Sequence, residues 1–273
     1  MSPDKDRLRY AAPAAELACR ILRHLSSPAH ASARLRDIAR ALNANPSSCL
    51  RVLRVLEREQ FIWLERASGK YSLGAYLYVL GSRAAVAVDL LRIALPHLRQ
   101  ASDLTGLTCS LSQRASETEL VYIAKEEPKA GIHISVSVGE TFPIVAGSHG
   151  KCHLAFMSES ESADLISSEG IAPFTKRTIT DPQRYLAELR KIRRLGYATS
   201  FEEWVPGING LSVPIIGRDG IVAAMSASGT SAVVTPARIR QIAPHFIGQA
   251  AQISADVKAT NITAAWRAVG IAR

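Results

Sequence analysis

The sequence predicts a two-domain α+β protein. Its length of 273 residues is about twice that of a typical domain. The front of the chain shows helical apolar periodicity followed by one short hairpin, whereas the rest mixes helices with strands that are mostly joined as hairpins. Hairpin-dominated strands mixed with helices indicate a mainly antiparallel sheet, so we expect a small front domain and a larger α+β rear domain.

The composition is that of an ordinary globular protein, with 47% apolar and 21% charged residues. The first ten residues, "MSPDKDRLRY", are charged and lack the apolar segment of a secretory signal, and no apolar run approaches the roughly 18 residues that span a bilayer. The four cysteines (Cys19, Cys49, Cys109 and Cys152) are scattered without CxxC spacing. We therefore expect free thiols and a cytoplasmic location.

The net charge of +9 is concentrated at the front. Residues 1–90 hold 14 Lys and Arg against 8 Asp and Glu, whereas the remainder holds 19 against 16. A basic front and a nearly neutral rear suggest that the front binds a polyanion such as nucleic acid. The alternative is a basic domain with no such partner.

Three helices are expected at the front, over residues 11–25, 33–44 and 46–60. In the third, Pro46 suits the first helical position because that N–H has no helical partner. Cys49, Val52, Leu53 and Leu56 form its apolar stripe. Two short helices joined by the tight turn "NANP" are typical of a helix-turn-helix.

The opposite face of the third helix is polar and basic. A strand over 61–66, a turn and a return over 71–74 follow it as the hairpin, or wing, of a winged helix. Arginine can bond guanine bidentately, and side chains near a hairpin tip can contact phosphate. The candidate DNA-binding residues are Ser47, Ser48, Arg51, Arg54, Arg58, Arg66 and Lys70. Two alternatives remain open: a merely solvated arginine face, and an Arg51 that braces the first helices.

The rear elements are marked by turn and capping residues. The sequence predicts a hairpin around "RASE", a strand in "GIHISVSVG" and a helix opened by "GKCHLAFM". A capping box of Ser158 with Glu161 predicts the next helix, and a further helix is expected between Asp181 and Gly196. A hairpin around Arg218–Gly220 and a helix over 236–257 complete the domain.

Two features of the rear domain favour an anion. Ser226 and Ser228 are two residues apart in a predicted strand, so both hydroxyls face the same side of the sheet. The loop "GSHG", residues 147–150, precedes a helix N-terminus, which carries free N–H groups and partial positive charge. Together they suggest a small carboxylate ligand. Ordinary strand serines and a tight turn that only caps a helix are the alternatives.

Several motifs, in order, resemble the IclR family of bacterial transcriptional regulators. "SSCLRVLRVL" is similar to the recognition-helix pattern S-T-x-x-R-L-L-x-x-L, and "GKYSLG" to the wing return G-x-Y-x-L-G. "FPIVAGSHGKCHLAF" resembles P-x-x-x-x-x-x-G-K-x-x-L-A, "AAMSASG" resembles A-x-S-x-S-G, and the long segment from "RTITDPQ" to "LSVPI" resembles the family's T-x-T-D to E-E to P pattern. The resemblance covers roughly residues 14–258.

The resemblance implies a winged helix-turn-helix DNA-binding domain over 10–74, a linker helix over 75–90 and a GAF-like effector-binding domain over 91–260. It also implies no cofactor, a homodimer or homotetramer, an inverted-repeat operator in double-stranded DNA and a small organic acid effector. The effector-binding residues carried over are Ile134, Phe142, Ser148, His149, Ser200, Ile208, Gly210, Ser226 and Ser228.

This chain departs from the family pattern in places. Ser200 stands where members that bind short keto acids tend to have Asp, and Gly210 where they tend to have Cys. His149 adds a donor that can become cationic. We therefore expect a different acid, aromatic or longer. Gln60 replaces the usual glycine at the end of the recognition helix, which predicts a less tight turn into the wing.

Catalysis and metal binding have little support. The chain contains no G-x-S-x-G, no Walker loop and no H-E-x-x-H. Glu202 and Glu203 are adjacent, so their side chains should diverge rather than converge. His149 and His153 have helical metal-ligand spacing, but no further ligand is close in sequence. The competing hypotheses are a small-molecule-binding enzyme with an accessory winged-helix module and a DNA-binding protein with a vestigial pocket.

Overall fold

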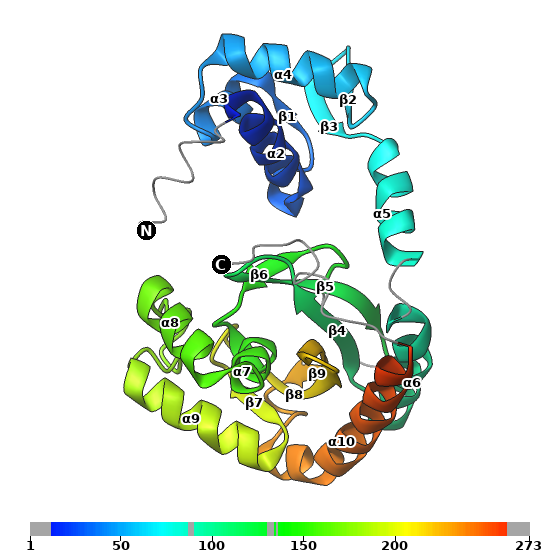
Figure 1. Cartoon of the computed structure of the whole chain (residues 1–273), viewed down its shortest axis with the longest axis vertical. Coiled ribbons are helices and arrows are strands. Elements are labelled where there is room, and N and C mark those ends of the chain that lie inside the picture. The colour runs from blue at the N-terminus through cyan, green and yellow to red at the C-terminus, as the bar shows by residue number, and fades with distance from the viewer. Residues whose placement is uncertain (1–11, 87–89, 130–133, 135, 261–273) are drawn as a thin grey trace. The chain divides into compact units, whose positions relative to one another are not determined.

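The computed structural model describes residues 12–86, 90–129, 134 and 136–260. The chain divides into two compact units, the front one ending at Ala87 and the rear one beginning at Val88 (Figure 1). The fold is α+β, as the sequence predicts.

The front unit is a small helical domain closed by a three-stranded antiparallel sheet of order β1-β3-β2. Its elements are α2 (Pro13–Ser26), the short 3-10 helix η1 (Pro28–His30), β1 (Ala33–Arg34), α3 (Leu35–Ala41), α4 (Pro46–Arg58), β2 (Ile62–Glu65), β3 (Lys70–Leu73) and α5 (Tyr76–Val86). The helix expected over 33–44 is shorter, because Ala33 and Arg34 pair with the wing strand β3 before the helix begins. The other two expected helices match α2 and α4 to within two residues.

The core of the front unit fixes the direction of α4. Ile21, Ile38 and Leu53, one from each main helix, are fully buried against one another. Asn45 caps α4, its side-chain oxygen accepting from the backbone N–H of Ser47 at 2.9 Å. Such a cap stabilises a helix by about 1 kcal/mol. The buried stripe and the cap leave the opposite face of α4 in solvent.

The turn from α4 into the wing is closed although glycine is missing. Gln60 adopts the left-handed backbone conformation, φ +63°, that glycine favours. The N–H of Phe61 then bonds to the carbonyl of Leu56 at 2.9 Å. A Cβ on Gly74 would lie 2.2 Å from the carbonyl oxygen of Gln60, so the wing returns tightly against this turn. The expectation of a looser turn is wrong, and Gln60 bears the backbone strain instead.

The rear unit is built on a six-stranded antiparallel sheet of order β6-β5-β4-β9-β8-β7. Its strands are β4 (Thr108–Arg114), β5 (Glu119–Glu126), β6 (Thr141–Pro143), β7 (Ala198–Phe201), β8 (Ile208–Gly217) and β9 (Gly220–Thr230). Its helices are α6 (Leu90–Thr105), α7 (Gly147–Ala155), α8 (Glu159–Glu169), α9 (Pro182–Leu195) and α10 (Pro236–Ala259).

Helices cover both faces of this sheet (Figure 1). One face packs on α6 and α10 through a core that includes Leu111, Met225 and Phe246. The other packs under α7 and α9 through a core that includes Leu120 and Tyr185. Because side chains alternate along a strand, the serines between the apolar residues of β4 and β9 face α7.

Most of the expected rear elements are confirmed. The two hairpins are β4–β5 and β8–β9. The capping box of Ser158 and Glu161 opens α8, Asp181 caps α9, and Gly196 ends it at φ +80°.

Two expectations about the rear unit need correction. Part of "GIHISVSVG", residues 131–133 and 135, lies outside the described residues, and the described residues 134 and 136–139 form no strand. Helix α7 begins at Gly147, so the expected loop "GSHG" is its first turn.

Candidate DNA-binding and effector-binding sites

The basic side chains of α4 are presented to solvent. Arg51, Arg54 and Arg58 are exposed along one face of the helix, with Ser47 at its start. Arg66 and Lys70 on the wing are also exposed, whereas Ser48 is half-buried. Arg58 Nε bonds to Glu59 Oε1 at 2.9 Å, so part of its charge is compensated within the protein. The arrangement leaves Arg51 and Arg54 as the stronger candidates for DNA contact.

The contacts of Arg51 do not favour the bracing alternative. Its Nη2 donates to Ser48 Oγ, one turn back on the same helix, at 3.3 Å. The guanidinium of Arg20 on α2 bonds instead to the carbonyl of Leu42, which follows α3. Arg36 and Arg40 on α3 are exposed and were not among the predicted residues, although they flank the apolar stripe of "LRDIARAL".

A ladder of hydroxyl groups crosses four strands of the rear sheet, β4, β9, β8 and β7, beneath α7. In one row Ser110 of β4 pairs with Ser226 of β9, which pairs with Ser212 of β8. The next row runs across Thr108, Ser228, Gly210 and Ser200, from β4 to β7. Because paired residues share a face, the serine and threonine side chains of both rows point toward α7.

His149 of α7 lies at the centre of the ladder. Its Nδ1 is 2.7 Å from Ser112 Oγ and 3.0 Å from Ser226 Oγ, and its Nε2 is 3.1 Å from Ser110 Oγ. The rings of Tyr122 and Phe142 meet the imidazole edge-on, with centroids 5.2 and 5.6 Å away. The site therefore combines hydroxyls, an imidazole and an aromatic wall.

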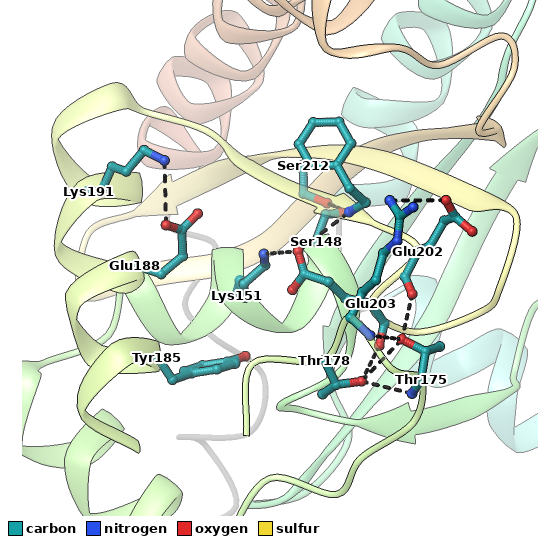
Figure 2. A network of polar contacts seen from close by, with 12 residues as sticks. Ser148, Lys151, Thr175, Thr178, Tyr185, Glu188, Lys191, Glu202, Glu203 and Ser212 are labelled. Atoms are coloured by element: carbon teal, nitrogen blue, oxygen red, sulfur yellow. Dashed lines mark hydrogen bonds and ion pairs between the residues drawn. The ribbon is translucent and has the colours of Figure 1, made fainter. Parts of the chain in front are cut away.

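The other end of the ladder lies beneath Ser148. Ser212 Oγ donates to Ser148 Oγ at 2.8 Å (Figure 2). Ser212 Oγ also contacts Ser226 Oγ. A Cβ on Gly210 would lie 2.9 Å from Ser148 Oγ and 3.4 Å from Ser228 Oγ. A larger residue at this position would therefore have to displace the hydroxyl of Ser148.

The structure brings most of the predicted effector residues together. Phe142, Ser148, His149, Ser200, Gly210, Ser226 and Ser228 lie along the ladder or against it. Ile134 and Ile208 lie at the margin of the ladder. The N–H of Ile134 donates to Thr108 Oγ1 at 3.1 Å. Ile208 pairs with Thr230, two residues before Gly210 on β8.

The prediction missed Thr108, Ser110, Ser112, Tyr122 and Ser212. The alternation in "LTCSLSQ" is the same signal that identified Ser226 and Ser228, and it places Ser110 and Ser112 on one face.

Burial keeps the imidazoles of α7 neutral. Desolvation lowers the pKa of His149 to about 3, with a smaller contribution from His153. Desolvation likewise lowers the pKa of His153 to about 3, and Arg114 lowers it further against an opposing hydrogen bond to Ser112. At neutral pH both side chains therefore act as uncharged hydrogen-bonding groups.

A buried ion pair holds α7 against the segment that follows β7 (Figure 2). Lys151 is 1% exposed, and its Nζ lies 2.7 Å from Glu203 Oε1. The backbone carbonyls of Glu202 and Glu203 accept bonds from Thr175 and Thr178, at 2.7 and 2.8 Å. The ammonium group of Lys151 is therefore neutralised within the protein by Glu203.

The two adjacent glutamates diverge, as predicted, because Glu202 pairs instead with Arg177 at 3.2 Å.

Over the described ranges no group of three His, Cys, Asp or Glu could hold a metal ion. In the same part of the chain, no helix is long and apolar enough to cross a membrane.

A winged helix-turn-helix with an exposed arginine face, joined to a domain with a buried cluster of serine and histidine side chains, is typical of ligand-responsive DNA-binding regulators. The family model "Bacterial transcriptional regulator IclR C-terminal" matches residues 82–255. The chain belongs to the IclR family.

Known relatives agree with this assignment. The HTH-type transcriptional repressor AllR of Escherichia coli K12 is 30% identical over 228 residues, 83% of each chain. The IclR transcriptional regulator of Alicyclobacillus acidocaldarius is 35% identical with a TM-score of 0.82, covering 90% of this chain and 99% of that one.

An IclR homolog of Microbacterium hydrocarbonoxydans complexed with 4-hydroxybenzoate has the same fold, with 21% identity and a TM-score of 0.75, covering 89% and 98%. The chain is a transcriptional regulator and not an enzyme.

Proposed function

We propose that this regulator senses a small organic acid at the hydroxyl ladder and binds an inverted-repeat operator as a homodimer or homotetramer in the cytoplasm. The observation that carries the proposal is the ladder with His149 at its centre, under the first turn of α7. Hydroxyls and free N–H groups at a helix N-terminus are suited to a carboxylate.

The aromatic wall favours an acid with a ring. Tyr122 and Phe142 are stacked with centroids 4.4 Å apart, directly beside His149. An aromatic acid could place its ring against this pair and its carboxylate toward the serines. The homologue complexed with 4-hydroxybenzoate supports this class of effector.

On the DNA side, the seven predicted residues of α4 and the wing supply the contacts. Arg51 and Arg54 would read base edges in the major groove, with Ser47, Ser48, Arg58, Arg66 and Lys70 on phosphates. Effector binding controls the regulator by favouring one arrangement of the two DNA-binding heads, since only a difference in affinity between states can shift their equilibrium.

Thermal unfolding in the presence of small acids tests the effector. Benzoate, 3- and 4-hydroxybenzoate and pyruvate form the first panel. A ligand that binds only the folded state stabilises it by about 2.7 kcal/mol at a hundredfold excess over its Kd. We expect a saturable rise in Tm with one acid, lost in Ser226→Ala/Ser228→Ala and kept in Ser160→Ala, an exposed serine of α8. An unchanged Tm with every acid would contradict the proposal.

A further inference from the structure

We propose that a carboxylate effector enters this site together with a proton, which His149 takes up on binding. The inference rests on the proposed function and adds a regulatory property to it: the effector response depends on pH. The geometry that carries it is a buried polar cluster in which the group able to gain a positive charge is an imidazole surrounded by hydroxyls.

The charges around His149 leave an incoming carboxylate without a ready counter-charge. On α7 itself, Lys151 is already paired with Glu203. On β4, Arg114 keeps its charge and donates to the carbonyls of Ser116 and Glu117, and that charge lowers the pKa of His153, whereas the pKa of His149 is lowered by burial and by His153.

The side chains of β5, β6, β8 and β9 that surround the imidazole are uncharged. Tyr122 of β5 is neutral, because burial and then Glu140 raise its pKa. Residues of β6, β8 and β9 that face the imidazole are Phe142 and the serines of the ladder. Burying a carboxylate without a counter-charge is unfavourable in free energy. Protonation of a neighbouring group supplies that counter-charge and is therefore the more favourable state.

His149 is better suited to take the proton than His153. A serine hydroxyl can donate to an imidazole nitrogen or, after rotation, accept from it. The three hydroxyls on His149 can therefore satisfy the neutral ring and both N–H groups of the imidazolium. His153 has a hydroxyl on Nε2, but its buried Nδ1 has no hydrogen-bond partner, so a second N–H there would be unsatisfied.

The sign of the pH effect follows from the two pKa values of His149. In the free protein burial holds its pKa at about 3, and a bound carboxylate raises it because an opposite charge favours the protonated form. Between these two values binding takes up a proton, so affinity rises as pH falls. The free energy of unfolding of the ligand-free protein has the opposite pH dependence. The unfolded chain binds the proton and the folded chain does not, so stability falls as pH drops below about 6.5.

Isothermal titration calorimetry of the full chain measures the proton directly. The panel acid that raises Tm most is titrated at about pH 6 in two buffers of different ionisation enthalpy. We expect close to one proton taken up per bound acid, and a Kd that falls about tenfold per pH unit as pH is lowered from about 7 to 5.5. The same acid as its neutral amide should bind without proton uptake.

Two matched variants locate the proton. His149→Gln keeps a hydrogen-bonding side chain but cannot become charged, so its Kd should lose the pH dependence and its proton uptake should vanish. His153→Gln, one turn away on the same helix, should keep both. Binding of the acid by the wild-type protein without proton uptake would overturn this inference and leave the proposed function intact. Failure of every acid to bind would overturn both, and uptake that persists in His149→Gln would exclude His149.

Discussion

Helices α4 and α7 are both short and both carry candidate ligand-binding residues of their domain, yet their polar side chains differ in exposure. α4 buries one stripe and leaves Arg51 and Arg54 in solvent. α7 is buried all round except at Gly147, including Lys151, which is 1% exposed. An exposed cation can serve a partner, whereas a buried cation must be paired within the fold.

This comparison assigns different energetic roles to the two sets of charges. Removing an arginine from α4 should affect binding and leave folding unchanged, because exposed charges contribute little to stability. Removing a partner of Lys151 should affect folding first, because it leaves an uncompensated buried charge. Three experiments would break or sharpen the contrast.

The largest effect is expected for the buried pair. Glu203→Gln removes the carboxylate 2.7 Å from Lys151 Nζ and leaves the ammonium group unpaired. Breaking a buried pair in this way costs about 3–5 kcal/mol. We expect that loss in the unfolding transition of the effector-binding domain, followed by urea and circular dichroism.

An exposed ion pair on α9 provides the control. Lys191 lies 3.5 Å from Glu188 with more than half of its side chain exposed, so Lys191→Met should change the free energy of unfolding by less than about 1 kcal/mol. The double variant Lys151→Met/Glu203→Gln should recover part of the loss, since no charge is left buried. Equal effects of Glu203→Gln and Lys191→Met would remove the distinction between the two helices.

The same contrast explains how much the sequence could predict. α4 has one buried stripe, and its caps and arginines follow from helical spacing alone. α7 is buried on all sides, so its sequence carries no periodic signal, and its start at Gly147 was missed. The serines of β9 were identified by alternation, but their partners on β4 and β8 depend on strand order and register, which are long-range properties.

The pairing of Lys151 with Glu203 could not be predicted either, because 52 residues separate them. Local capping signals were more reliable: Ser158, Asp181 and Gly196 each end or begin a helix as predicted. Such caps need no knowledge of distant contacts, since the bonding groups lie within one turn.

On the exposed helix, the expected effect is on DNA binding. Arg51→Ala and Arg54→Ala should each weaken operator binding by about 1–3 kcal/mol if the side chain bonds a base edge. Fluorescence anisotropy at several salt concentrations separates the modes, because loss of a phosphate contact lowers the salt slope and weakens all sequences equally. Arg194→Ala, an exposed arginine at the end of α9, is the control. A loss of thermal stability in Arg51→Ala, with DNA binding unchanged, would instead support the bracing role.

The smallest effect concerns the turn that joins α4 to the wing. Gln60 holds φ +63°, a conformation that costs a non-glycine residue about 1 kcal/mol or more. Glycine relieves this strain but loses more backbone entropy on folding, so Gln60→Gly should stabilise the front unit by at most about 1 kcal/mol. Glu59→Gly is the matched control: its φ of −83° suits any residue, and glycine there should destabilise by about 0.5–1 kcal/mol. If both glycines destabilise equally, Gln60 is not strained, and the closed turn owes nothing to its backbone conformation.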